Sequence, residues 1–474
     1  MKIVTPFQAK EIERIAGEVM DLKVEVLIER AAKSFIEVLK EDFSNLDELK
    51  IHFLFGPGNN GKDARKVSQL LGKSKENIPL GSCDIVVDGM FGIGLNRQLN
   101  DIEQNLIDEV NKSGKPVYSI DVPSGVNALT GEVLGRAIQA FKTVTFFGCK
   151  PGMLFGDGKD CAGKIYIKDL GLSDVKKIEE IYSISEAKFN PKLLFRKSNT
   201  HKGVFGSVLI VAGSDNMRGA ASLAAMGAFA AGAGLVYVAT TERVWNSVSV
   251  IVPEAIGVIM IENDEGGIAG SNAGEIISIA KKVDAVIAGP GMMKCGDTKK
   301  IVKRLINDIK TPLILDADAL NSIISSYIKR PLLITPHIGE MERISKETKE
   351  KIISNRIQFL TNFCDKNNCV TLLKGSGTIV CSPDAKLAIN TSGNPGMAVA
   401  GSGDVLSGIL VALLAQGQDL FDAASGGANL HGMAGDLAAL EKGQLSMTAS
   451  DIARNVSKAC LQIETEIRAL NGAK

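Results

Sequence analysis

The chain has 474 residues, 49 of them glycine and 45% of them apolar, which fits two or three compact α/β domains and excludes a disordered protein. Its 54 basic and 54 acidic residues balance to zero net charge, which argues against nucleic acid or an acidic membrane as its main partner. Eight scattered cysteines without a C-x-x-C pair, four distant histidines and a start unlike a signal peptide indicate a cytoplasmic protein with reduced thiols and no zinc site.

The first half of the chain is predicted to form helices followed by a parallel sheet. Amphipathic segments extend to about Lys40. Apolar runs separated by helix-length segments then predict strands at 51–55, 85–88, 117–121, 143–147 and 164–167. A charged stretch at 173–180 leads to the second half, and we place the boundary near Ser183, which gives domains 1–182 and 183–474.

Polar residues follow several of these predicted strands. The glycine loop at 56–61 precedes a helix, so its backbone N–H groups face a bound anion. Asp88 and Asp121 each end a strand, where an aspartate either joins a ligand site or caps the next helix. Lys150 either pairs with a carboxylate of the same crevice or is solvated.

The second half repeats the α/β rhythm at larger scale. Strands are predicted at 208–212, 235–238, 285–288, 313–315, 332–335 and 370–373. The Ala/Gly-rich run at 219–240 is long enough for a membrane span, but Gly232 and Gly234 interrupt it, so it predicts a buried helix followed by a strand. Polar turns follow four strands, and we expect them to share one crevice because ligand groups gather at the carboxyl ends of parallel strands. These turns lie at 213–215, 289–291, 316–318 and 335–337.

The most informative segment of the chain ends in Gly401-Ser402-Gly403-Asp404, which opens an apolar helix. Unpaired N–H groups at such a helix start form an anion site, and glycines let a phosphate approach. Asp404 is the one carboxylate there and fits a general base. Residues 374–378, Lys-Gly-Ser-Gly-Thr, offer further donors beside a cation. Alone, a glycine-rich helix start is often structural; together, these features indicate nucleotide-dependent phosphoryl transfer.

Five motifs of the second half occur in a recognisable order. They are His201-Lys-Gly-x-x-Gly-x-Val-Leu-Ile-Val-Ala-Gly-Ser, Gly289-Pro-Gly291, Asp316-Ala-Asp-Ala-Leu-Asn321, Thr335-Pro-His-x-Gly-Glu-Met341 and Gly393-Asn-Pro-Gly-Met-Ala through Asp404. Residues 190–470 thereby resemble the NAD(P)HX dehydratase family. The resemblance implies a ribokinase-like fold and the use of ADP or ATP, with Mg²⁺, to dehydrate (6S)-NADHX or (6S)-NADPHX to NADH or NADPH. It also implies a homo-oligomer, with tetramers common.

Position by position, the resemblance assigns roles in this second half. Asp404 looks like the base that acts on the hydrate hydroxyl. The adenine nucleotide would be held by Lys374, Gly375, Ser376, Gly377, Thr378 and Gly403. The hydrate pocket would be lined by Ala220, Gly291 and His337. The reaction suits such a site, since water leaves poorly and a phosphate ester of the same hydroxyl leaves readily.

The first half resembles the YjeF N-terminal domain, the NAD(P)HX epimerase that interconverts the R and S hydrates and is usually fused to this dehydratase. By this resemblance Asp121 and Lys150 look catalytic. A potassium ion would be bound by Asn60, Asp88 and Ser124. The substrate would be bound by Asn59, Asn60, Gly61, Lys62, Asp63, Gly92, Gly94 and Asp121.

The first half also departs from the family pattern. The loop has Lys62 and Ala64 where the family has glycine, and a Lys62 side chain would stand where the backbone should approach substrate. Fewer than thirty residues separate Asn60 from Ile85, so we expect a Rossmann-like three-layer domain that lacks one βα unit. Two alternatives stay open: a dehydratase whose first domain is an inactive scaffold, and a small-molecule kinase of ribokinase-like fold, such as a vitamin-precursor kinase.

Overall fold

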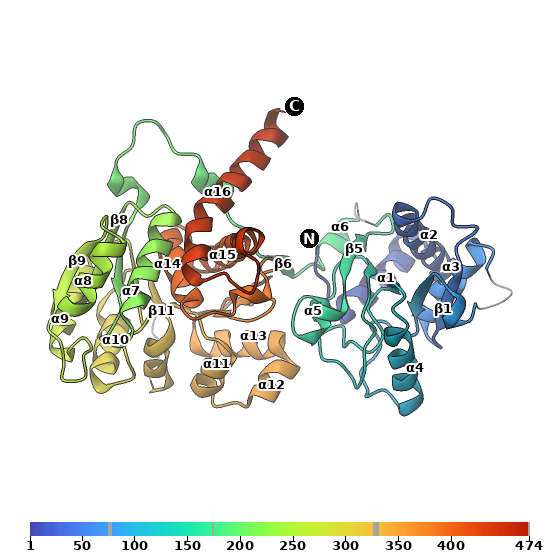
Figure 1. The fold of residues 1–474 in the computed structure, drawn as a ribbon, viewed down its shortest axis with the longest axis horizontal. Helices are drawn as coiled ribbons and strands as arrows, with labels where there is room; N and C mark the ends of the chain where they lie inside the picture. Colours follow the sequence, from blue (N-terminus) through green and yellow to red (C-terminus); the bar gives the residue numbers. More distant parts are fainter. Residues whose placement is uncertain (74–77, 173–174, 326–330, 473–474) are drawn as a thin grey trace. The chain divides into compact units, whose positions relative to one another are not determined.

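A computed structural model describes residues 1–73, 78–172, 175–325 and 331–472 of the chain. The chain divides into two compact units, Met1–Glu186 and Ala187–Lys474. Each unit combines helices with a largely parallel sheet and has its own apolar core (Figure 1). The α/β class predicted from the sequence is confirmed.

The sheet of the first unit has the order β1-β2-β3-β4-β5, and its paired strands are parallel. Its strands are β1 (Ile51–Phe55), β2 (Ile85–Gly89), β3 (Val117–Ile120), β4 (Lys142–Phe146) and β5 (Lys164–Lys168). Residues of β2, β3 and β4 are buried throughout, which explains why they form continuous apolar runs in the sequence. Parallel pairing places their carboxyl ends on one edge of the sheet.

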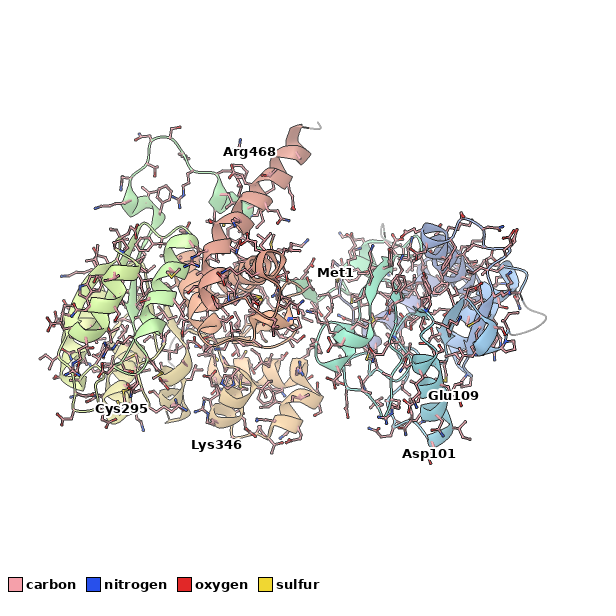
Figure 2. The ribbon with its side chains drawn as sticks, in the orientation of Figure 1. Met1, Asp101, Glu109, Cys295, Lys346 and Arg468 are labelled. Atoms are coloured by element: carbon pink, nitrogen blue, oxygen red, sulfur yellow. The ribbon has the colours of Figure 1, made fainter. Side chains whose placement is uncertain are left out.

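Helices cover both faces of this sheet and make the expected three layers. Successive strand residues point to opposite faces. Phe53 and Val87 pack with the first three helices on one face, whereas Leu54 and Val86 pack with α4 on the other. The helices are α1 (Pro6–Met20), α2 (Val24–Asp42), α3 (Asn59–Leu70), α4 (Asp101–Lys112), α5 (Asp157–Cys161) and α6 (Lys176–Glu179), followed by the short strand β6 (Ile184–Glu186). The opposite face of α4 exposes Asp101 and Glu109 (Figure 2) together with the apolar Ile102.

Strand β1 lies at the edge of the sheet. Among the described residues between α3 and β2, the one regular element is the 3₁₀ turn Leu80–Ser82. This segment lies along β1, because the Ile78 carbonyl is 2.7 Å from His52 Nδ1 and Asp84 Oδ2 accepts from the backbone of Lys50 at 2.8 Å. The described residues between α3 and β2 therefore contain no strand and no α-helix, in agreement with the short connection expected from the sequence.

The sheet of the second unit has the order β15-β14-β13-β12-β11-β10-β7-β8-β9. Pairing is parallel from β13 to β9 and antiparallel where β14 joins β13 and β15. The strands are β7 (Ser207–Val211), β8 (Leu235–Thr241), β9 (Ile256–Met260), β10 (Ala285–Ala288), β11 (Leu313–Leu315), β12 (Leu333–Ile334), β13 (Val370–Leu373), β14 (Ile379–Cys381) and β15 (Leu387–Ile389).

Two buried helices, α7 and α14, pack tightly in the second unit because small residues let their backbones approach. A Cβ added at Gly227 would lie 2.3 Å from the Val405 carbonyl, and one added at Gly408 would lie 2.0 Å from the Ala224 carbonyl. The helices of this unit are α7 (Arg218–Ala230), α8 (Glu242–Ile251), α9 (Ala273–Ala280), α10 (Gly296–Asp308), α11 (Ile338–Ser345), α12 (Lys349–Ser354), α13 (Arg356–Asn367), α14 (Ser402–Ala415), α15 (Leu420–Lys442) and α16 (Ala449–Gly472). Across the described ranges, every helix is too short or too polar to cross a membrane.

Candidate active sites

The first unit holds a buried ion pair where β3 and β4 end. Asp121 follows β3, and Lys150, which is 1% exposed, forms an ion pair with it. Lys150 Nζ also donates to Thr145 Oγ1 at 2.8 Å and to the Phe146 carbonyl at 2.9 Å, and Thr145 Oγ1 donates to Asp121 at 3.0 Å. Asp121 has a φ of 66°, a left-handed conformation that a non-glycine residue keeps only where its surroundings enforce it. The two charged groups are therefore held in position.

A second carboxylate, Asp88, lies at the end of β2 and is fully buried. Its oxygens accept hydrogen bonds from Ser124 Oγ (2.6 Å), Ser124 N (2.9 Å) and Ser119 Oγ (2.9 Å). Asn60 is connected to Ser124 through the backbone of Phe91. Phe91 N donates to Ser124 Oγ at 2.8 Å, and the Phe91 carbonyl accepts from Asn60 Nδ2 at 2.6 Å. Burial raises the pKa of Asp88, and no described lysine, arginine or histidine pairs with it. Asn60, Asp88 and Ser124 thus form one connected group.

Glycines bring the loop at 56–61 against the end of β2. A Cβ at Gly56 would lie 1.8 Å from the Met90 carbonyl, and one at Gly61 would lie 1.9 Å from the Gly56 carbonyl. Helix α3 begins within this loop, at Asn59. Residues spaced three or four apart share a helix face, so Asn59 and Asp63 are directed to the same side.

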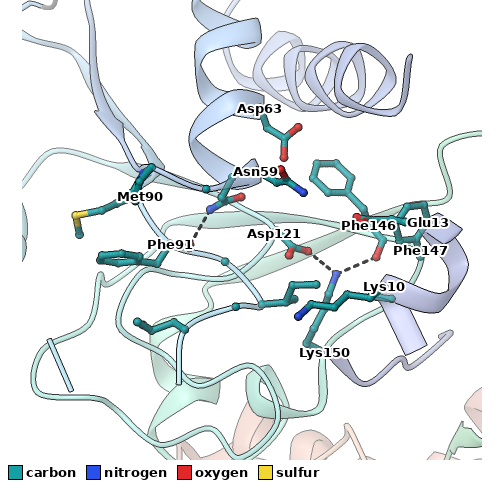
Figure 3. A pocket seen from close by; sticks show the side chains of 18 of the residues that line it. Lys10, Glu13, Asn59, Asp63, Met90, Phe91, Asp121, Phe146, Phe147 and Lys150 are labelled. Carbon is teal, nitrogen blue, oxygen red and sulfur yellow. Dashed lines mark hydrogen bonds and ion pairs between the residues drawn. The ribbon is translucent and has the colours of Figure 1, made fainter. Parts of the chain in front are cut away.

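A cavity of about 360 Å³ opens beside the Asp121–Lys150 pair (Figure 3). The predicted residues that line it are Asn59, Asn60, Asp63, Gly92, Gly94, Asp121 and Lys150. Gly61 and Lys62 are outside the lining, and the Lys62 side chain is exposed. Three further charged residues line the cavity without having been selected from the sequence: Lys10, Glu13 and Arg97.

The second unit has its own buried lysine–aspartate pair. Asp316 follows β11, and its Oδ1 accepts from Lys374 Nζ at 2.8 Å, while its Oδ2 accepts from Ser407 Oγ at 2.7 Å. Burial acts to raise the pKa of Asp316, but the charge of Lys374 and these hydrogen bonds outweigh burial and lower it. Glu340 Oε2 lies 3.7 Å from Lys374 Nζ. The lysine is therefore anchored by two carboxylates.

Asp404 lies in the first turn of α14, close to this pair. A Cβ built on its neighbour Gly403 would lie 3.5 Å from Lys374 Nζ, so the ammonium group and the helix start adjoin each other. Burial chiefly, with the charge of Asp316, raises the pKa of Asp404 to about 7. No described group hydrogen-bonds to the Asp404 carboxylate, which leaves it able to accept a proton near neutral pH.

His337 begins α11 and caps it. Its Nδ1 accepts from the backbone N–H of Gly339 (3.0 Å) and Glu340 (3.3 Å), so Nδ1 is unprotonated and Nε2 carries the hydrogen. Burial chiefly lowers the pKa of His337, and Lys374 adds to this effect. The backbone of His337 bridges that of Lys374. A neutral imidazole therefore stands beside the lysine.

The polar turns that follow β7, β10 and β11 in the second unit lie close together. Gly213 N donates to the Pro290 carbonyl at 2.8 Å, and Met293 N donates to Asp318 Oδ2 at 3.0 Å. A Cβ added at Gly291 would lie 3.0 Å from that of Ala220, so these two predicted pocket residues are neighbours.

Residues 375–378 connect β13 to β14 in a tight turn. Thr378 Oγ1 closes the turn by donating to the Gly375 carbonyl at 3.1 Å. Gly377 has a φ of 69°, a conformation that glycine adopts without steric cost. Gly375 N donates to Thr378 Oγ1 at 3.4 Å, whereas Ser376 is exposed, so its backbone N–H group is accessible to a ligand beside Lys374.

Sequence reasoning selected the residues in glycine and aspartate motifs but missed their supports. Ser407 lies within an apolar helix and Glu340 was quoted only as part of a motif, yet both hold the Asp316–Lys374 pair. Asp436 was also missed, although its carboxylate accepts from Gly393 N at 2.9 Å and Asn394 Nδ2 at 3.0 Å. The spacing of 91 residues between Asp316 and Ser407 carries no local signal.

We expect Asp316→Ala to destabilise the second unit by about 3 kcal/mol, because removing one partner leaves the charge of Lys374 poorly compensated in a largely buried site. Urea unfolding followed by fluorescence of Trp245, the one tryptophan, measures this unit. Asp215→Ala is the control, since Asp215 pairs with the exposed Arg218 and exposed pairs contribute about 1 kcal/mol or less. If both variants lost the same free energy of unfolding, a stabilising role of the buried pair would be contradicted.

Comparison with solved structures defines the class of protein. The second unit resembles a ribokinase-like superfamily protein of Enterococcus faecalis (TM-score 0.52, 23% identity, covering 59% of this chain and 96% of that one). It also resembles the ADP/ATP-dependent NAD(P)H-hydrate dehydratase of Bacillus subtilis, co-crystallised with ATP and Mg²⁺ (TM-score 0.51, 26% identity, covering 58% and 99%). Together with the two strand-end sites, this makes the chain a two-domain α/β enzyme with a ribokinase-like second unit.

Sequence comparison then identifies the family. The sequence model of NAD(P)H-hydrate dehydratase matches residues 208–458, and that of the YjeF-related protein N-terminus matches residues 65–152. The bifunctional NAD(P)H-hydrate repair enzyme Nnr of Thermofilum pendens is 33% identical over 97% of this chain and 96% of its own length. The corresponding enzyme of Moorella thermoacetica is 31% identical over 100% and 99%. The chain belongs to the family of bifunctional NAD(P)H-hydrate repair enzymes.

Proposed function

We propose that the second unit dehydrates (6S)-NADHX and (6S)-NADPHX at the expense of ADP or ATP, and that the first unit interconverts the R and S hydrates. The observation that carries the dehydratase is the position of Asp404. This carboxylate stands at a helix start, beside a lysine, with a pKa of about 7. A site with a base and anion-binding groups at one place suits phosphoryl transfer to a hydroxyl.

The proposed reaction proceeds through a phosphate ester. Asp404 accepts the proton of the hydrate hydroxyl as the hydroxyl oxygen attacks the terminal phosphorus of the nucleotide. Lys374 and the N–H groups at the start of α14 hold the transferred phosphoryl group. The ring nitrogen then expels phosphate, and loss of a proton from the neighbouring ring carbon restores the double bond. The products are NAD(P)H, phosphate and the shortened nucleotide.

The residues around Lys374 fit a nucleotide that brings its own Mg²⁺. Among the described residues no group of three or more histidine, cysteine, aspartate or glutamate side chains could hold a metal. Mg²⁺ commonly binds one or two carboxylates together with substrate phosphates, so a dedicated protein cage is unnecessary. Bound Mg²⁺ would neutralise phosphate charge, while Gly375, Ser376, Gly377, Thr378 and Gly403 supply backbone donors. Ala220, Gly291 and His337 would line the hydrate pocket.

In the first unit, Asp121 and Lys150 are proposed to act on the hydrate carbon, with the substrate in the cavity beside them. Asn59, Asn60, Asp63, Gly92 and Gly94 line that cavity and support this placement. Asp121 exchanges a proton with the hydroxyl, and Lys150 keeps its carboxylate oriented. The intact geometry argues against an inactive scaffold.

Asn60, Asp88 and Ser124 are proposed to hold K⁺. The buried Asp88 lacks a described cationic partner and has a raised pKa, so a nearby monovalent cation would offset the cost of its charge. Side-chain oxygens suit such a hard cation. The role of the ion would be to keep the loop around Phe91 in place beside the cavity.

The thiols and the surface of the enzyme support two proposals about its setting, a cytoplasmic location and association into oligomers. All eight cysteines are free, which supports the reducing cytoplasm. Edge strand β9 exposes Ile256 (38%) and Ile259 (47%), and an exposed apolar edge supports association with further copies of the chain. We infer a homo-oligomer, which light scattering of the purified chain tests directly: a monomer would contradict it.

We expect the full chain to convert an entire mixed R/S NADHX preparation to NADH with ADP or ATP and Mg²⁺. The measurement is absorbance at 340 nm, recorded faster than spontaneous epimerisation. Conversion that stops at the S fraction would mean that the first unit is a scaffold. Absence of conversion with either nucleotide would overturn the dehydratase and favour a ribokinase-like small-molecule kinase.

A further inference from the structure

The cavity of the first unit contains an acidic residue whose role nothing above accounts for. Glu13 lies on α1, one turn after Ala9, and both residues line the cavity. Its carboxylate is partly buried and forms no hydrogen bond or ion pair with any described residue. Of the other carboxylates in the lining, Asp121 is paired with Lys150, and Asp63 is already placed among the residues proposed to bind the substrate. Glu13 is therefore free to contact a ligand.

The charged groups around Glu13 come from three parts of the unit (Figure 3). Lys10 lies on the same helix, Asp63 on α3, and Asp121 with Lys150 at the strand ends. Burial chiefly, with the charge of Asp121, raises the pKa of Glu13, although Lys150 and Lys10 act in the opposite direction. Burial, Asp121 and Glu13 raise the pKa of Asp63 well above its ordinary value. Carboxyl groups that are buried and crowded in this way hold a proton more readily than isolated ones.

Epimerisation of the hydrate needs two proton-transfer groups. The ring nitrogen expels the hydroxyl as water once an acid protonates it, and the ring becomes a cation. Water then adds to the other face of that carbon while a base takes its proton. The departing and entering oxygens lie on opposite faces. Asp121, immobilised by Lys150 and Thr145, reaches one of them.

We propose that Glu13 is the second proton-transfer group of the epimerase, and this inference rests on the epimerase activity proposed above. In one direction Glu13 donates its proton to the leaving hydroxyl and Asp121 accepts one from the entering water. In the other direction their roles are exchanged, so the proton count balances and no further reactant is needed. Burial and the charge of Asp121 favour the protonated form of Glu13.

The test compares Glu13→Gln with Glu11→Gln in the full chain. Glu11 lies two residues away on the same helix, but it is paired with Arg14 at 2.5 Å and is outside the cavity lining. We expect Glu13→Gln to lower the kcat for R-to-S conversion about a hundredfold with KM little changed. The wild-type rate should fall as rising pH deprotonates Glu13, and the variant should lose this dependence. Glu13→Asp should recover part of the rate.

The dehydratase reaction provides an internal reference. S-hydrate turnover by the second unit should be unchanged in each variant, which shows that the second unit is intact, while partial recovery of the epimerase rate in Glu13→Asp shows that the first unit is folded. If the wild-type protein epimerises the hydrate and the Glu13→Gln variant does so at the same rate, the role of Glu13 is overturned while the epimerase activity stands. If the wild-type protein does not convert the R hydrate to the S hydrate faster than the spontaneous rate, the epimerase activity is overturned, and this inference with it.

Discussion

Asp404→Asn should lower turnover of the S hydrate by about 10²–10⁴-fold, the contribution typical of a general base. Asparagine keeps the size of the side chain but cannot accept the proton of the hydrate hydroxyl. In the wild type, turnover should fall as pH drops below about 7, because the Asp404 carboxylate becomes protonated around the pKa raised by burial and Asp316. The measurement is NADH formation from the S hydrate with saturating ADP or ATP between about pH 5.5 and 9. This range extends roughly two pH units to either side of the pKa of Asp404.

The same substitution should change stability in the opposite sense. The pKa of Asp404 is about 7 when folded and 3.8 as the reference value, so the folded chain binds the extra proton between these values and loses stability as pH rises through this window. Asparagine carries no such cost. Asp404→Asn should therefore unfold at higher temperature than the wild type at about pH 8 and at a similar temperature near pH 4. A variant that is stable yet retains most of its turnover would contradict the role of Asp404 as base.

Asp121→Asn combined with Lys150→Met should halt conversion of a mixed hydrate pool at the S fraction. Replacing both members avoids leaving a lone buried charge, which would cost about 3–5 kcal/mol. R-hydrate turnover should fall to the spontaneous rate, because the group that exchanges a proton with the hydroxyl and the group that orients it are both absent. The rate is followed at 340 nm with the dehydratase in excess.

The same unit offers a matched control for this double variant. Lys142, at the start of β4, is buried and forms an ion pair with Asp42 at 2.5 Å, away from the cavity lining. Asp42→Asn with Lys142→Met removes a comparable pair and should leave epimerisation intact. If the control lost epimerisation as severely as Asp121→Asn with Lys150→Met, the effect would reflect general loss of structure rather than catalysis.

The short connection between α3 and β2 does not disturb the first site. Asp88, Asp121, Ser124 and Lys150 keep their mutual contacts, and the loop glycines keep their close backbone approach. These residues depend on the inner strands β2, β3 and β4, whereas the shortened segment lies at the edge of the sheet. Loss of peripheral structure is therefore compatible with an active first unit.

The direction of the Lys62 side chain depends on where α3 begins. Read as part of a loop, a lysine in place of glycine stands in the path of the substrate. In the structure α3 begins at Asn59, and the helical periodicity directs Asn59 and Asp63 into the cavity while Lys62 points to solvent. The loop packs against the end of β2, and this contact sets the residue at which α3 begins. The local sequence does not reveal such a contact.

Local sequence determined much of this protein. Apolar runs predicted the inner strands because strands buried on both faces admit few polar residues. Glycine steps predicted the turns because left-handed or crowded backbone positions exclude a Cβ. The interrupted Ala/Gly run at 219–240 predicted the buried helix α7 and the strand β8. Asp404 could be selected because it follows a glycine turn at a helix start.

Tertiary structure alone decided the chemistry of these residues. Asp404 has a pKa near 7 because of burial and the charges of Asp316 and Asp318, which are remote in the chain. The Asp121–Lys150 and Asp316–Lys374 pairs join residues 29 and 58 positions apart. Glu13, on an ordinary amphipathic helix, meets the cavity only through packing of α1 on the sheet. Electrostatic energies depend on distance and burial in space, and neither quantity is encoded in a short stretch of sequence.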